Sequence, residues 1–127
     1  MDMNHAISWF EIPTQDIERA ARFYETIFQI QLFPMDMPNL PMRVFPVEDM
    51  QNEVSGALVQ SADFHFPSNS QGVLIYLNAN GKLDAILNRI AEAGGEVIVP
   101  RTEISPEHGY MAVFIDSEGN RIGLHSV

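Results

Sequence analysis

The sequence contains no cysteine, few basic residues and no long apolar run. Without cysteine the chain can form neither a disulfide nor a thiolate metal site, and we expect a reducing, cytoplasmic environment. No stretch approaches the roughly 18 consecutive apolar residues of a membrane-spanning helix, so we expect no membrane segment. Residues 1–10 (MDMNHAISWF) lack a basic stretch followed by an apolar one, so we expect no secretory signal.

Charge of one sign is also scarce. Seven lysines and arginines stand against 17 aspartates and glutamates, which gives a net charge of −10. Affinity for a phosphate backbone needs clustered basic side chains, so we expect no nucleic-acid partner. An acidic surface favours cationic ligands or simply solubility, and the composition leaves both open. With 46% apolar and 19% charged residues, the chain has an ordinary globular composition.

The first half of the chain reads as a strand, a helix and further strands. Residues 6–13 alternate as a strand does, with Phe10 and Ile12 on one face and Trp9 and Glu11 on the other. Residues 17–28 carry apolar side chains three and four positions apart, which predicts an amphipathic helix. Thr14 or Asp16 is suited to begin it as an N-cap. A proline-rich segment over residues 29–49 predicts edge strands and loops, and residues 54–62 predict a strand.

The second half repeats this order. We predict a strand over residues 73–79, a helix that starts near Leu83 and ends at Gly94 and Gly95, and strands over residues 96–100, 110–115 and 121–127. Residues 116–120 (DSEGN) predict a tight turn. The two apolar helix stripes open at Ile17 and Leu83, 66 residues apart, which indicates duplication of a βαβββ unit.

We therefore expect an α+β fold in a single domain over residues 1–127. Module 1 would cover about residues 1–66 and module 2 about residues 67–127. Paired modules would form a curved mixed sheet with helices on its convex side. The concave cleft left open on the other side would be the ligand site.

Three stretches of the sequence resemble the vicinal oxygen chelate (VOC) superfamily, which includes glyoxalase I (lactoylglutathione lyase), bleomycin resistance proteins and extradiol dioxygenases. They are IPTQDIERAARFYETIF (12–28), LDAILNRIAEAGGEVIVP (83–100) and MAVFIDSEGNRIGLHS (111–126). The combination of WFEIP, GGEVIVPRTEI and DSEGNRIGLHS looks most like the glyoxalase-related subgroup of unassigned activity. The resemblance covers essentially the whole chain and implies the paired-module fold. It also implies a homodimer.

The resemblance further implies four metal-ligand positions, one on each of four concave strands. They fall at Trp9, near Leu58, near Leu74 and at Gly123, and the prolines leave the register near Leu58 open by a residue or two. Side chains of Trp, Leu and Gly cannot coordinate a divalent metal. We expect no metal cofactor, and hence neither glyoxalase I activity nor extradiol cleavage by the usual mechanism.

Strand alternation predicts which other side chains face the cleft. The expected set is Trp9, Glu11, Leu58, Gln60, Leu74, Tyr76, Asn78, Gly123 and His125. Glu11 and His125 come from different modules, so a pair between them could transfer protons or hold a displaced metal ion. Equally, Glu11 could make a satisfied polar contact while His125 frays near the C-terminus. Trp9 and Tyr76 could stack on a ligand or belong to the core.

Two classes of function remain open. One is a small-molecule binding protein, without metal, that takes a planar or cationic ligand in the cleft. The other is an enzyme of the isomerase, epimerase or lyase type that uses Glu11 and His125. A loop with His65 between Phe64 and Phe66 could close over the cleft or pack as a hydrophobic turn. The sequence does not identify the ligand or the reaction.

Overall fold

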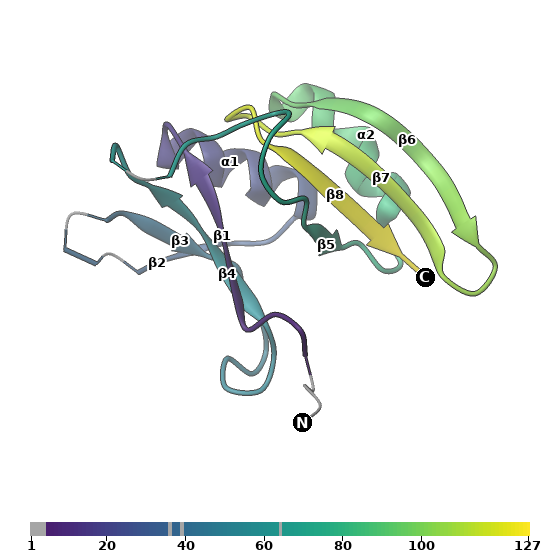
Figure 1. Ribbon diagram of the computed structural model, residues 1–127, viewed down its shortest axis with the longest axis horizontal. Coiled ribbons are helices and arrows are strands. Elements are labelled where there is room, and N and C mark those ends of the chain that lie inside the picture. Colours follow the sequence, from purple (N-terminus) through teal and green to yellow (C-terminus); the bar gives the residue numbers. More distant parts are fainter. Residues whose placement is uncertain (1–4, 36, 39, 64) are drawn as a thin grey trace.

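In the computed structural model, which describes residues 5–35, 37–38, 40–63 and 65–127, the chain forms two four-stranded sheets and two helices (Figure 1). The first half contains β1 (Trp9–Thr14), α1 (Ile17–Phe28), β2 (Phe33–Pro34), β3 (Met42–Val44) and β4 (Ser55–Gln60). The second half contains β5 (Tyr76–Asn78), α2 (Leu83–Ala93), β6 (Glu96–Ser105), β7 (Gly109–Ile115) and β8 (Arg121–Ser126). The expected α+β class and the repeated strand–helix–three-strand order are confirmed.

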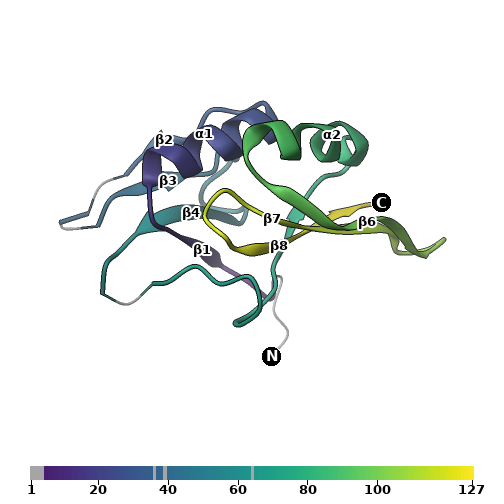
Figure 2. The same ribbon diagram turned by 90° about the horizontal axis from the view of Figure 1, so that it is seen from above.

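The two sheets have the same topology. Their strand orders are β1-β4-β3-β2 and β5-β8-β7-β6. In each sheet the first strand pairs in parallel with the last, and the remaining pairs are antiparallel, so both sheets are mixed. Both helices lie on the same side of the sheets (Figure 2), which leaves the opposite face of each sheet without a helix.

The ends of both helices follow the sequence signals. The Asp16 carboxylate accepts a hydrogen bond from the backbone N–H of Arg19 at 3.1 Å and so caps the start of α1. Helix α2 ends at Gly94, whose φ of 110° lies in the left-handed region that glycine adopts without strain. Neither helix reaches the length that a membrane crossing requires in the described part of the chain.

One apolar core lies between the helices and the sheets of both halves. It includes Ile12 of β1, Tyr24 of α1, Ile86 of α2, Phe114 of β7 and Leu124 of β8, all at most 1% exposed. Burying large apolar side chains is the main favourable term in folding. Because residues from both halves share this cluster, the halves stabilise one another.

The turn between β7 and β8 also joins the two halves. Asn120 donates from Nδ2 to the backbone oxygen of Pro13 at 2.7 Å. The buried Glu118 carboxylate accepts hydrogen bonds from the backbone N–H groups of Gln15 and Asp16, each at 2.8 Å, and pairs with Arg19. The sequence predicted only a turn here, and the structure shows that its side chains fix the end of β1 against the start of β8.

Some element bounds differ from the expectation. Strand β5 covers only Tyr76–Asn78 within the expected 73–79, and β6 continues five residues beyond Pro100. Proline is tolerated in β6 because this strand lies at the edge of its sheet. The expectation of an edge strand is wrong for β3, which lies between β2 and β4.

Candidate functional site

The helix-free faces of both sheets carry most of the side chains that the sequence singled out. On β1, Ile12 points into the core. Trp9, which is 36% exposed, and Glu11 point to the opposite face of the strand. On the second sheet, Tyr76 pairs with Gly123 and Asn78 pairs with His125 in the parallel β5–β8 ladder. Directly paired residues lie on the same face, so these four face the helix-free side together.

The expectation for β4 is wrong by one residue. Leu58 pairs with Ile12 instead of Glu11 and is fully buried in the core beneath the helices. Gln60 lies on the same face and accepts a hydrogen bond from the backbone N–H of Ile17 at 2.8 Å, at the start of α1. A shift of one residue moves every side chain of a strand to the other face. Neither Leu58 nor Gln60 therefore faces the open side.

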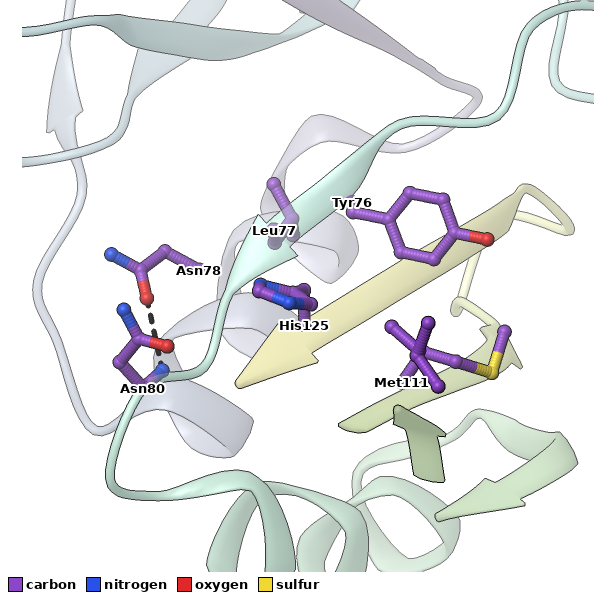
Figure 3. A pocket seen from close by; sticks show the side chains of 7 residues that line it. Tyr76, Leu77, Asn78, Asn80, Met111 and His125 are labelled. Atoms are coloured by element: carbon purple, nitrogen blue, oxygen red, sulfur yellow. Dashed lines mark hydrogen bonds between the residues drawn. The ribbon is translucent and has the colours of Figure 1, made fainter. Parts of the chain in front are cut away.

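A cavity of about 730 Å³ lies over the second sheet (Figure 3). Such a volume lies within the range typical of small-molecule sites. Tyr76, Asn78 and His125, which the sequence placed on the open face, line it. The other lining residues are Leu77, Asn80, Ile104 and Met111. Trp9, Leu74 and Gly123, which the sequence also placed there, are not among the lining residues.

Gly123 shapes this cavity indirectly. A β-carbon at Gly123 would lie 2.5 Å from the ring of Tyr76, closer than any real contact allows. The Tyr76 ring therefore lies directly over this glycine and remains 49% exposed. The space that glycine leaves on β8 is filled by an aromatic ring, which presents a flat surface to the cavity.

A backbone contact fixes the imidazole of His125. Its Nε2 donates a hydrogen bond to the backbone oxygen of His108 at 2.7 Å, in the turn between β6 and β7. That turn is held by Ser105, whose hydroxyl oxygen accepts from the backbone N–H of His108 at 3.0 Å. With Nε2 acting as the donor, the neutral ring keeps Nδ1 as a hydrogen-bond acceptor. His125 is thus ordered, not frayed.

Of the two alternatives left open for Glu11, the structure shows a polar contact with residues other than His125. Glu11 accepts a hydrogen bond from His65 Nε2 at 2.8 Å and a longer one from Trp9 Nε1 at 3.3 Å. His65 belongs to the segment between β4 and β5, which therefore returns to β1. The proposed aromatic loop also included Phe64, which lies outside the described residues.

A second cavity, of about 270 Å³, lies where β1 approaches the start of β8. Glu11 and His65 line it, so the Glu11 and His125 side chains belong to different cavities. Arg121 lines the second cavity as well, and apolar walls come from Pro13, Ile75 and neighbouring residues.

Three groups with shifted pKa values lie at the junction between the halves. Burial raises the pKa of the Asp116 carboxyl, although hydrogen bonds from Asn120 and Tyr24 oppose this effect. Burial beside this carboxylate raises the pKa of the Tyr24 hydroxyl well above its usual value. For Glu118, burial is outweighed by hydrogen bonds from Arg19 and two backbone N–H groups, so its pKa is lowered. These groups hold the fold together.

The side chains at the family's metal positions do not fit a metal centre. The Trp9 indole N–H is a donor, Leu74 is aliphatic, and Gly123 lies under the Tyr76 ring. On β4 the residues beside Leu58 that share the face of Glu11 are Ala57 and Val59, which are equally apolar. Within residues 5–35, 37–38, 40–63 and 65–127, no three His, Asp or Glu side chains gather as a metal site requires.

Several site residues escaped the sequence analysis. Ile104 lies beyond the expected end of its strand, and Asn80 follows β5. Met111 stands on a predicted strand, but only its pairing with His125 places it on the open face. The contact of His65 with Glu11 joins residues 54 positions apart and leaves no local pattern.

Comparisons with known proteins agree with this architecture. A sequence model of the Glyoxalase/Bleomycin resistance protein/Dioxygenase superfamily matches residues 6–124. A "Glyoxylase-like domain-containing protein" of Didymella fabae is 27% identical over 94% of this chain and 92% of its own length.

Solved structures give the same fold at lower identity. A glyoxalase/bleomycin resistance protein from Albidiferax ferrireducens T118 superimposes with a TM-score of 0.72 at 16% identity, over 97% of this chain and 100% of that one. A glyoxalase-related enzyme from Fulvimarina pelagi gives a TM-score of 0.67 at 15% identity, over 98% of this chain and 89% of that one. At these identities the likeness concerns the fold alone.

Proposed function

We propose that this chain, which belongs to the Glyoxalase/Bleomycin resistance protein/Dioxygenase superfamily, binds a small planar molecule in the cavity over its second sheet. The observation that carries the proposal is the cavity itself, with the half-exposed Tyr76 ring on one side and Met111 on the other. Ligand sites are commonly apolar with a few polar groups that fix orientation.

The chemistry of the lining favours a planar ligand over a cationic one. Tyr76 offers an aromatic face for stacking, and Ile104 and Met111 add apolar surface. The polar groups are the amides of Asn78 and Asn80 and the imidazole of His125. Since no carboxylate lines this cavity among the described residues, a cation would find no counterion there. A flat, uncharged ligand with one or two hydrogen-bonding atoms at its rim suits these groups.

The test is a ligand-observed NMR screen with neutral planar aromatic fragments, followed by titration of the best binder. Tyr76→Leu removes the stacking surface and should weaken binding about fivefold, since aromatic contacts contribute about 1 kcal/mol beyond area. Phe33→Leu is the matched control, because Phe33 is an exposed aromatic side chain on β2 outside the cavity. Equal affinities for wild type and Tyr76→Leu would refute the proposal.

We further propose that this binding needs no divalent metal. The support is that Trp9, Leu74, Gly123 and the apolar residues of β4 offer no side-chain atom that coordinates a metal ion.

A homodimer, which the family resemblance leads us to expect, is a separate proposal. Light scattering coupled to size-exclusion chromatography tests it directly.

The contact between Glu11 and His65 supports a second candidate, an enzyme of the isomerase, epimerase or lyase type. A carboxylate that accepts from an imidazole can orient it for proton transfer, so His65 replaces His125 as the partner of Glu11 in this hypothesis. Turnover of a small oxygenated compound that is lost in Glu11→Gln, but retained in Tyr76→Leu, would favour this candidate over simple binding.

A further inference from the structure

Arg121 differs from three other arginines of the described chain in how its charge is neutralised. Arg19, Arg43 and Arg101 each pair with a carboxylate, from Glu118, Glu18 and Asp84 respectively. Arg121 forms no ion pair with any described residue, and its Nε–H is buried without a hydrogen-bond partner. Its Nη2 donates only a long hydrogen bond, 3.3 Å, to the backbone oxygen of Gly72.

A buried Nε–H without a partner is unfavourable, because the desolvated donor loses its hydrogen bond to water. The carboxylate that lines the same cavity does not relieve this. Both oxygens of Glu11 are engaged, one by His65 and the other by Trp9. The second cavity therefore contains a cation whose counterion the described part of the chain does not supply.

From this arrangement we propose that the second cavity is a separate binding site for a small monocarboxylate, with Arg121 as its anchor. The planar guanidinium matches the two oxygens of a carboxylate, which accept in parallel from neighbouring N–H groups. Nε and Nη2 lie on one edge of the guanidinium. A ligand carboxylate on this edge would replace the long bond to Gly72 and, with a small shift of the Arg121 side chain that opens its edge to the cavity, satisfy the buried Nε–H.

The remaining lining residues determine the size and polarity of the part of the ligand beyond its carboxylate. Pro13, Ile75 and Val73 line the cavity beside Arg121. An apolar cavity of about 150 Å³ holds one benzene ring. At about 270 Å³ the second cavity has room for one small ring or a short aliphatic chain together with the carboxylate. The net charge of −10 repels anions in general, so binding here needs specific donors.

The probe is benzoate, with benzamide as its neutral analogue of the same shape. The first readout is the Arg121 Nε–H signal in ¹H–¹⁵N NMR, assigned by its disappearance in Arg121→Lys. Benzoate is expected to shift this signal in a saturable manner, whereas benzamide leaves it in place. Equal shifts with both compounds, or no shift with benzoate, would overturn the proposal from measurements on the wild-type protein alone.

Calorimetric affinities test the anchor itself. Arg121→Gln should weaken benzoate binding by about tenfold or more, because a charge-assisted bidentate contact is lost. Arg22→Gln is the matched control, since it removes the same charge from an exposed position on α1 and should leave the affinity unchanged. Equal losses in both variants would show a general charge effect and refute the site.

Two further arms separate the alternatives. Inorganic phosphate is expected to compete poorly, and tighter binding of phosphate than of benzoate would refute a carboxylate site in favour of a general anion site. Tyr76→Leu should leave benzoate binding unchanged, because Tyr76 lines the other cavity. This arm distinguishes failure of the present inference from failure of the planar-ligand proposal.

If Arg121→Gln does not fold, Arg121→Lys replaces it in the test. This variant keeps the charge but loses the bidentate edge, so a weaker affinity for benzoate is expected.

Discussion

His65 Nε2 donates a hydrogen bond to the Glu11 carboxylate at 2.8 Å, although the two residues are 54 positions apart in the sequence. The contact ties the segment between β4 and β5 back to β1, beside the second cavity. The same carboxylate accepts from the Trp9 indole. Trp9 and Glu11 stand on one face of β1, and the Glu11 carboxylate binds both the Trp9 indole and His65 of this segment.

Breaking this contact should loosen the segment more than it lowers global stability. Glu11 and His65 are each about 30% exposed, at 30% and 28%, and such pairs contribute about 0–1 kcal/mol. In His65→Gln we expect faster amide hydrogen exchange over residues 61–75, with little change in the urea midpoint. His5→Gln is the control, because His5 is exposed and outside this contact. Unchanged exchange in His65→Gln would show that other contacts hold the segment.

Gly123→Ala should displace the Tyr76 ring. The added β-carbon would lie 2.5 Å from the ring, and overpacking of this kind costs about 1–3 kcal/mol. In the double variant with Tyr76→Ala the clash is removed, so the two changes should couple strongly in a double-mutant cycle measured by urea unfolding. Additive effects would mean that the ring does not lie over Gly123.

Glu118→Gln should destabilise the protein at neutral pH. The change removes the charge that pairs with Arg19 and weakens the hydrogen bonds from Gln15 and Asp16, at a cost of about 1–3 kcal/mol. Urea unfolding at pH 7 measures this cost. Glu107→Gln, at an exposed position in the turn between β6 and β7, is the control and should be neutral.

The stability difference between wild type and Glu118→Gln should depend on pH. The pKa of Glu118 is lowered in the fold, so its stabilisation is complete above its unfolded pKa of about 4.3. It is lost as the pH falls through the lower, folded pKa. The difference should therefore be constant near neutral pH and shrink in acid, and a difference that grows in acid would contradict the assigned direction.

Removal of metal ions should leave the protein unchanged. The positions at Trp9, Leu74 and Gly123 carry no side-chain donors, so dialysis against a chelator should alter neither the melting temperature nor the binding of planar fragments. Mass spectrometry of tag-free protein measures metal content directly. Near-stoichiometric zinc, nickel, iron or manganese would contradict the proposal and direct attention to Glu11 and His65.

Local patterns predicted the parts of the fold that depend on near neighbours in the chain. The apolar stripes placed both helices, Asp16 and Gly94 marked a start and an end, and alternation placed Trp9 and Glu11 on one face of β1. These features follow from backbone periodicity and capping, which act within a few residues. They sufficed to indicate the duplicated order and the superfamily.

Alternation alone could not fix β4, because a strand has two possible assignments of face. The proline-rich segment before it left the register open, and the pairing with β1 decided that Leu58 faces the core and Gln60 caps α1. The same limit applies to Met111, whose place in the cavity depends on its pairing with His125.

The sequence by itself determined the fold class, the two helices and the lack of metal-coordinating side chains at the family's metal positions. Only the tertiary structure decided the partners: His65 for Glu11, the His108 backbone for His125, and no carboxylate for Arg121 among the described residues. The physical reason is range. Periodicity and capping are encoded in adjacent residues, whereas hydrogen bonds and cavities form between segments that meet only once the core has packed.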